Sequence, residues 1–188
     1  MATLPPGDPQ RFRLHIEHYE LLAAAEAFAM QRVEMIDGQV LMTRPKDRDH
    51  TRLTSELLWR LRPLLQVIAP WMDAFVGVSV ALPPHDMPTP DVVVAASQIE
   101  TNYWQAGDIA IVIEVANASL STDLSVKRHL YAEHGIPEYW VVDVERRQVH
   151  QFWTPADGDY RETRIVPLAG DIHSVTLPNL TVNGAGIL

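Results

Sequence analysis

Apolar residues recur every three or four positions in two stretches of the chain, which is the spacing of one face of an α-helix. The first stretch covers residues 15–30 and is rich in Ala, Leu and Glu, which favour helices. The second covers residues 49–69, and Asp47 or Asp49 is available to cap its start. Because Pro63 has no amide hydrogen to donate, we expect this long helix to kink or end just before it.

Other stretches alternate between apolar and polar residues, as half-buried strands do. An Asp37-Gly38 pair separates two short extended runs, residues 32–35 and 39–43, and such a pair favours a β-hairpin because both residues tolerate positive φ. A further alternating run over residues 73–82 predicts another strand. The sequence PPHDMPTP follows it and predicts a loop or a sheet edge, since proline donates no backbone hydrogen bond.

Two short apolar runs, residues 91–95 and 109–115, are rich in β-branched residues and predict central strands. The polar sequence NASLSTD then precedes a helix in LSVKRHLYAEHG, which we expect to stop at Gly135 and Pro137. The sequences EYWVVDV, QVHQFW and DGDYRETRIV predict three more strands. This order of elements predicts an α/β fold in which helices flank a mixed β-sheet.

The length and composition are those of one globular domain. At 188 residues the chain favours a single domain over residues 1–188, with a proline-containing irregular lead-in over residues 1–10. No apolar run approaches the roughly 20 residues of a membrane helix, so we expect no contact with a membrane. The N-terminus carries prolines and charges where a signal peptide needs an apolar stretch, which makes the cytoplasm the expected location.

Charge and cysteine usage limit the chemistry that the chain can support. The absence of cysteine excludes disulfides and cysteine zinc sites, so a metal would need carboxylate, imidazole or carbonyl ligands, as Mg²⁺ or Mn²⁺ does. The net charge of −9 argues against coating nucleic acid by bulk electrostatics, but it leaves a local site open. We expect no organic cofactor, since the C-terminal GAG lacks the strand and helix of a phosphate loop.

Two carboxylates interrupt or border the apolar strands. Glu114 shares a strand face with Val112, and a buried carboxylate is costly unless it is paired, hydrogen-bonded or bound to metal. Asp91 follows Pro90 at the start of its strand, where loops leave room for a ligand. If the two strands are neighbours, both carboxylates can converge on a cation. The alternatives are a turn-capping Asp and a Glu that pairs with an Arg.

Lys127 is the third candidate. We expect it in the first or second turn of a helix begun by Thr122 or Asp123, where the positive end of the helix dipole disfavours a cation. A nearby carboxylate pair or a substrate phosphate would compensate the charge. The alternative is an i,i+4 pair of Lys127 with Asp123 on a solvated helix face.

Several sequence blocks together resemble a known family. The blocks VEMIDGQVLM, PDVVV and VIEVANAS with TDLSVKRHLYAEHGIPEYWVVD are similar to the Uma2 family, also called DUF820, of the PD-(D/E)xK nuclease superfamily. The likeness covers about residues 33–160, and residues 114–143 are its most specific part. It implies a restriction-endonuclease-like α/β fold, with Asp91 as the aspartate of the PD pair and Glu114 as the acidic residue of the second half-motif.

The resemblance departs from the usual superfamily pattern at the lysine. The position two residues after the glutamate holds Ala116, and the resemblance places the lysine on the following helix, at Lys127. Glu34 and His50 match positions that the family tends to keep, which suggests supporting roles for both.

The resemblance implies a metal-dependent endonuclease that hydrolyses DNA. Asp91 and Glu114, with the carbonyl of Val115 as a further candidate ligand, would hold one Mg²⁺ or Mn²⁺. The ion would activate a water and polarise the scissile phosphate. Lys127 would orient that water or stabilise the charge that builds on the phosphate.

Two other functions remain open. The acidic charge and Ala116 favour a catalytically inactive nuclease-fold module that binds or regulates. A glycosidase-like pair formed by Asp91 and Glu114 is the third hypothesis, although no cluster of aromatic residues indicates a sugar groove. A homodimer is a further expectation, because homodimers are the commonest oligomers and two sites would ease cleavage of both strands.

Overall fold

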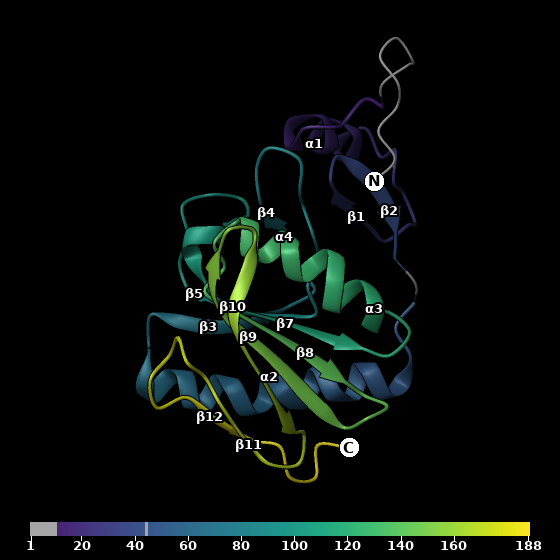
Figure 1. The fold of residues 1–188 in the computed structure, drawn as a ribbon. Helices are drawn as coiled ribbons and strands as arrows, with labels where there is room; N and C mark the ends of the chain where they lie inside the picture. Colours follow the sequence, from purple (N-terminus) through teal and green to yellow (C-terminus); the bar gives the residue numbers. More distant parts are fainter. Residues whose placement is uncertain (1–10, 44) are drawn as a thin grey trace. The chain divides into compact units, whose positions relative to one another are not determined.

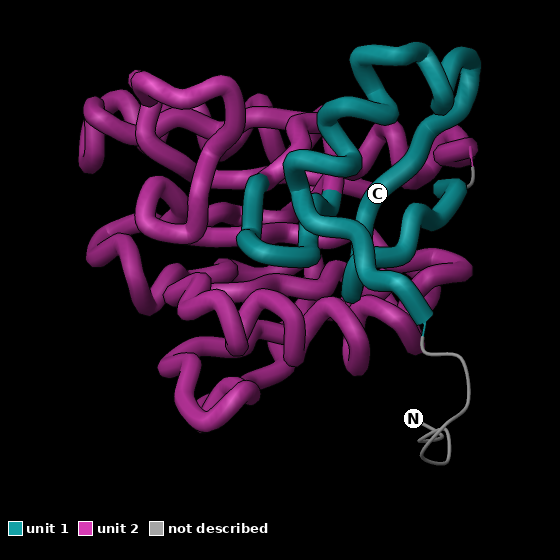
Figure 2. The backbone as a smooth tube through the Cα atoms, turned by 90° about the horizontal axis from the view of Figure 1, so that it is seen from above, with its two compact units in different colours: residues 1–44, 81–88 teal, residues 45–80, 89–188 magenta. Residues whose placement is uncertain are grey.

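The chain divides into two compact units. A computed structural model describes residues 11–43 and 45–188, so the predicted irregular lead-in lies outside the described residues. The first unit comprises Met1–Arg44 with Ala81–Pro88, and the second comprises Pro45–Val80 with Thr89–Leu188 (Figure 2). This division does not test the prediction that residues 1–188 form a single domain, which therefore stays a prediction.

The first unit contains a helix, α1 (Ile16–Ala24), and the hairpin of β1 (Val33–Ile36) and β2 (Gln39–Met42). The predicted hairpin turn is confirmed, because Asp37 and Gly38 have φ values of 53° and 68°. Met87, from the proline-rich segment, forms an isolated antiparallel bridge with Met35 of β1. The expectation of a loop or edge in this segment is therefore also met.

The first helix is shorter than its sequence pattern predicts. It ends at Ala24, and the chain continues in turns to Met30. Only Ile16 and Tyr19 of the helix are buried. Since most helical stability in proteins comes from packing an apolar face, a stretch that buries so little has no packing to extend it.

A six-stranded mixed sheet forms the centre of the second unit (Figure 1), in the order β10-β9-β8-β7-β5-β3. Its strands are β3 (Met72–Val76), β5 (Val92–Ala96), β7 (Ile109–Ala116), β8 (Glu138–Asp143), β9 (Gln148–Ala156) and β10 (Asp159–Pro167). The pair β7 and β8 is parallel and the other neighbours are antiparallel. The predicted mixed sheet is confirmed, with the strands at 91–95 and 109–115 in its interior.

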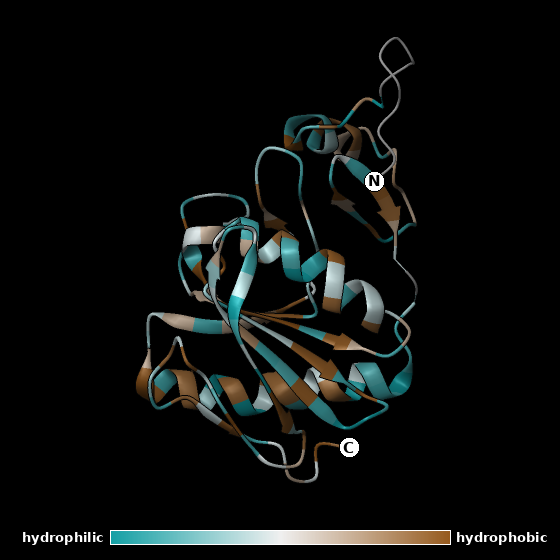
Figure 3. Cartoon of the chain, viewed as in Figure 1, coloured by the Kyte–Doolittle hydropathy of each residue, from teal (hydrophilic) through white to brown (hydrophobic). Residues whose placement is uncertain are grey.

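Helices cover both faces of this sheet (Figure 1). α2 (Arg48–Ile68) crosses one face, and a second helical segment lies on the other. That segment consists of α3 (Leu120–Thr122), the π-helical turn η2 (Asp123–Lys127) and α4 (Arg128–Glu133). The central strands β5 and β7 are strongly hydrophobic (Figure 3), as strands buried on both faces of a sheet require. The predicted flanking helices are confirmed.

Pro63 does not end α2, so the predicted helix end there is wrong, and the alternative of a kink stays a prediction. The helix runs on to Ile68. Pro63 lies on the exposed side, and Trp59, whose carbonyl would have accepted its missing amide hydrogen, is 78% exposed. Water can therefore hydrate that carbonyl, while the buried leucines of the opposite face hold the helix against the sheet. No described helix is both long and apolar enough to cross a membrane.

The strand predicted over residues 73–82 is interrupted, which corrects that prediction. β3 ends at Val76, and Gly77 has a φ of 62°, a left-handed conformation that an extended strand does not contain. A two-residue strand, β4 (Val80–Ala81), follows at the boundary of the two units. The smaller elements β6 (Trp104–Gln105), η1 (Ala106–Asp108), β11 (Asp171–His173) and β12 (Thr181–Asn183) were not predicted.

Candidate active site

Asp91 and Glu114 lie at one end of the neighbouring strands β5 and β7. These strands pair antiparallel, with Val92 opposite Ile113. Continuing that register by one residue places Asp91, which directly precedes β5, opposite Glu114. The condition for the two carboxylates to converge is therefore met, and both are buried, at 7% and 2% exposure.

The carboxylate of Asp91 is held from three sides. The backbone amide of Val115 donates a hydrogen bond of 2.8 Å to Oδ2, and His50 Nε2 lies 2.9 Å from the same oxygen. Lys46 Nζ lies 3.0 Å from Oδ1. An ionised carboxylate only accepts hydrogen bonds, so His50 acts as a donor through Nε2.

These contacts keep Asp91 ionised. Burial alone would raise the pKa of the Asp91 carboxyl, but the hydrogen bond from His50 and the positive charge of Lys46 outweigh burial and lower the pKa to about 2. Asp91 therefore presents a negative charge throughout the neutral pH range.

The start of α2 brings His50 to this position. Asp47, one of the two predicted candidates, is the N-cap of the helix, and its Oδ1 accepts the amide hydrogen of His50 at 2.8 Å. Its Oδ2 accepts a hydrogen bond of 2.8 Å from the side chain of Asn117, the residue that follows β7. One aspartate thus connects the beginning of α2 to the end of the strand that carries Glu114.

Glu114 is paired with the predicted lysine. Lys127 Nζ lies 2.9 Å from Glu114 Oε1, and the hydroxyl of Tyr131 donates to the same oxygen at 3.0 Å. Both of these hydrogen bonds go to Oε1 of Glu114. The lysine therefore meets a strand carboxylate, which the alternative of a solvated surface pair did not anticipate.

The π-helical turn η2 explains how Lys127 reaches the sheet. The helical segment begins at Leu120, earlier than predicted, and its second part widens into η2. Asp123 and Lys127 both point inward from this turn and are only 2% and 7% exposed. The predicted solvated face for this pair is thus wrong. A wider turn of this kind is frequent at functional sites, because it re-aims side chains within a helix.

Burial and the neighbouring negative charges both raise the pKa of Glu114. Burial raises the pKa of Glu114 well above its ordinary range, and the negative charges of Asp91 and Asp123 act in the same direction, against the positive charge of Lys127. Burial also raises the pKa of Asp123. A cation bound at this site would act in the opposite direction, lowering both pKa values and favouring the ionised carboxylates.

Asp123 also belongs to this site, whereas the sequence indicated it only as a helix start or as a surface partner of Lys127. Its Oδ2 is buried without a hydrogen-bond partner among the described residues, as is Nδ1 of His50. Within the same part of the chain, no three Asp, Glu or His side chains form a group that could hold a metal ion. Two carboxylates with several waters, the usual coordination of Mg²⁺, suit these residues better than a closed protein cage.

Four of the five predicted residues belong to the second unit. Asp91, Glu114, Lys127 and His50 come together in the second unit, and the structure adds Lys46 and Tyr131 to them. Tyr131 could have been found as the residue one turn after Lys127, whereas nothing local connects Lys46 with Asp91. Glu34 lies in β1 of the first unit and is 8% exposed, and its supporting role stays a prediction.

Comparison with known proteins gives a family and a fold. The family model Uma2, described as "Putative restriction endonuclease", matches residues 16–184. A crystal structure from Anabaena variabilis, described as a putative nuclease belonging to DUF820, superposes with a TM-score of 0.72 at 16% identity. The match covers 93% of this chain and 97% of that one. No curated protein matches the chain.

Proposed function

The chain belongs to the Uma2 family, and we propose that it is a metal-dependent endonuclease that hydrolyses phosphodiester bonds of DNA. The observation that carries the proposal is the pairing of Glu114 with Lys127 beside Asp91, at the end of two central strands. This arrangement supplies two carboxylates and one lysine, the residue types that the family resemblance implies. The α/β fold that it shares with the Anabaena structure supports the same proposal.

Asp91 and Glu114 would hold one Mg²⁺ or Mn²⁺, with the carbonyl of Val115 as a further candidate ligand. Hard oxygen donors are the ligands that these ions prefer, and the Glu114 carboxylate, whose Oε1 accepts from Lys127 and Tyr131, would offer its other oxygen, Oε2, to the ion. When bound, such an ion lowers the pKa of a coordinated water and polarises a phosphoryl oxygen.

Other residues of the chain would orient the metal-binding carboxylates and supply a positive charge. The Val115 amide and His50 fix the Asp91 carboxylate by hydrogen bonds to Oδ2, so its orientation is set before any ligand arrives. Lys127 carries a positive charge next to Glu114 and can donate hydrogen bonds to negative charge that develops on the phosphate. Tyr131 restrains Glu114 Oε1 from the helix side.

Cleavage of plasmid and of short DNA duplexes with Mg²⁺ or Mn²⁺ tests the proposal. We expect the wild-type protein to cut and Glu114→Gln to lose at least about 100-fold in rate, the loss that follows removal of a key electrostatic group. Glu145→Gln, in the exposed turn after β8, is a matched control and should cut normally. Cleavage that survives Glu114→Gln would sink the proposal.

A catalytically inactive nuclease-fold module is the second candidate function. The net charge of −9 and the buried Ala116, at the usual lysine position, favour it. Calorimetric titration of the wild-type protein with Mn²⁺ separates the two functions. Saturable binding that Glu114→Gln weakens supports the endonuclease, and no binding by the wild-type protein supports the inactive module.

A further inference from the structure

The two oxygens of the Asp91 carboxylate have different kinds of partner. The Val115 amide and His50 Nε2 both donate to Oδ2, and each belongs to a regular element, β7 or α2. A carboxylate oxygen accepts about two hydrogen bonds, so these donors fill Oδ2. The remaining oxygen, Oδ1, is in contact with Lys46 Nζ at 3.0 Å.

Lys46 differs from the other charged residues around Asp91 in its exposure. Its side chain is 39% exposed, whereas the side chains of Lys127 and His50 are 9% and 8% exposed. It precedes Asp47, the N-cap of α2, and lies outside any helix or strand. A long side chain on such a segment can leave Asp91 and move into solvent without disturbing a packed element.

We propose that Lys46 and a divalent ion compete for Oδ1 of Asp91, and that the displaced Lys46 ammonium binds a phosphate of the DNA. The inference rests on the proposed function, because it needs a metal site at Asp91. Two cations cannot share one carboxylate oxygen without strong repulsion. The Val115 amide and His50 belong to packed elements and stay hydrogen-bonded to Oδ2. The exposed Lys46 is therefore the group that moves.

The competition predicts that loss of Lys46 strengthens metal binding. In calorimetric titrations of the intact protein with Mn²⁺, we expect Lys46→Gln to lower the Kd about fivefold, which corresponds to about 1 kcal/mol. Arg48→Gln is the matched control, since it also removes one positive charge near the start of α2. The Arg48 side chain is 91% exposed and pairs with Asp49, so its loss should leave the Kd unchanged.

The phosphate contact predicts a second effect that depends on the ion. With a duplex whose backbone resists hydrolysis, we expect Lys46→Gln to reduce the salt dependence of binding by about one phosphate contact when Mn²⁺ is present. With EDTA instead, Lys46 stays on Asp91, so Lys46→Gln should bind the duplex as the wild-type protein does. Fluorescence anisotropy across a salt series measures both slopes.

The outcomes separate this inference from the proposed function. If the wild-type protein binds Mn²⁺ and Lys46→Gln binds it equally or more weakly, the competition is overturned while the metal site stands. An unchanged salt slope in Mn²⁺ overturns the phosphate contact. If the wild-type protein binds no Mn²⁺, the proposed function and this inference both fail. Equal thermal unfolding of the two variants and the wild-type protein excludes a folding defect as the cause.

Discussion

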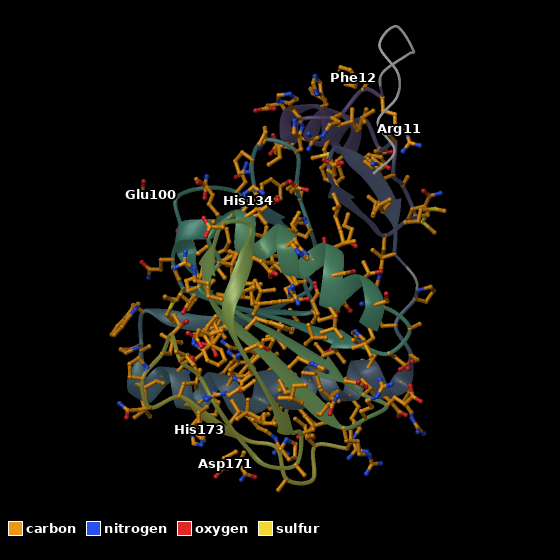
Figure 4. The ribbon with its side chains drawn as sticks, in the orientation of Figure 1. Arg11, Phe12, Glu100, His134, Asp171 and His173 are labelled. Atoms are coloured by element: carbon orange, nitrogen blue, oxygen red, sulfur yellow. The ribbon has the colours of Figure 1, made fainter. Side chains whose placement is uncertain are left out.

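Glu114 and Glu138 are buried glutamates on the neighbouring parallel strands β7 and β8, yet they have different partners. Glu138 is 0% exposed and accepts hydrogen bonds from Trp140 Nε1 at 2.7 Å and from the Ser174 hydroxyl at 2.7 Å. The backbone amides of Val175 and Thr176 donate to the same carboxylate at 3.0 and 2.9 Å. All these donors are neutral. Those of Ser174, Val175 and Thr176 connect the start of β8 to the segment that follows His173, a residue labelled in Figure 4.

The carboxylate of Glu114 has instead a lysine ammonium and a tyrosine hydroxyl on one oxygen and negatively charged neighbours around it. A carboxylate satisfied by neutral donors that come from the backbone and small side chains stabilises the fold. A buried carboxylate that lies close to other charged groups is typical of a functional site, because a bound ligand can still interact with it. The comparison therefore assigns stability to Glu138, and it supports the proposed chemical role of Glu114.

The largest effect that would test this contrast is a loss of turnover at Lys127. If the proposed function is right, we expect Lys127→Met to reduce the single-turnover cleavage rate at least about 100-fold, since it removes the charge proposed to act on the phosphate. The affinity for Mn²⁺ should stay or rise, because Lys127 is not a ligand and repels a cation. Arg161→Met, which breaks an exposed ion pair with Asp157, is the control and should change neither quantity. A parallel loss of Mn²⁺ affinity would show that Lys127 acts through folding.

Glu138→Gln should show the opposite pattern. The introduced amide group cannot accept hydrogen bonds on one side, which leaves at least one buried donor without a partner and costs about 2 kcal/mol. For a chain of this size we expect the Tm to fall by about 4–8 °C in thermal unfolding. The cleavage rate of the folded fraction should match that of the wild-type protein. A selective loss of turnover with normal stability would remove the contrast between the two glutamates.

The smallest expected effect is a pH dependence of the free energy of unfolding that arises from the titration of Glu114. Burial raises its folded-state pKa above the ordinary 4.5, so the folded protein holds this proton more tightly than the unfolded chain does. The resulting stabilisation is fully present below pH 4.5 and is lost as the pH rises through the folded-state pKa. Urea unfolding in EDTA at several pH values should therefore show wild-type stability falling relative to Glu114→Gln as the pH rises. If the difference in unfolding free energy between the two proteins does not change with pH, Glu114 is not the group responsible.

Local physics explains what the sequence predicted correctly. The hairpin at Asp37-Gly38, the cap at Asp47 and the helix end before Gly135 each depend on residues within one turn. The apolar runs of β5 and β7 need only the burial that their own residues seek. The resemblance to a family added the pairing of Asp91, Glu114 and Lys127 that local patterns alone left open.

Where the sequence failed, the deciding contact was distant or depended on exposure. Pro63 is tolerated because it lies on the solvent side of α2. The two three-residue strands β11 and β12 are too short to show an alternating pattern. Apart from Trp140 and Gln151, the partners of Glu138 lie 36 to 38 residues away, so no local signal separates this glutamate from Glu114.

The sequence by itself determined the order of the main elements, the mixed sheet and the residues at which carboxylates enter apolar strands, because these follow from hydrophobic periodicity and turn chemistry. Only the tertiary structure decided the surroundings of each charge. The π-helical turn buries Asp123 and Lys127, and a segment outside the regular elements brings Lys46 to Asp91. Burial and the distance between charges are properties of packed elements, and they set which carboxylate is satisfied by the fold and which one remains available to a ligand.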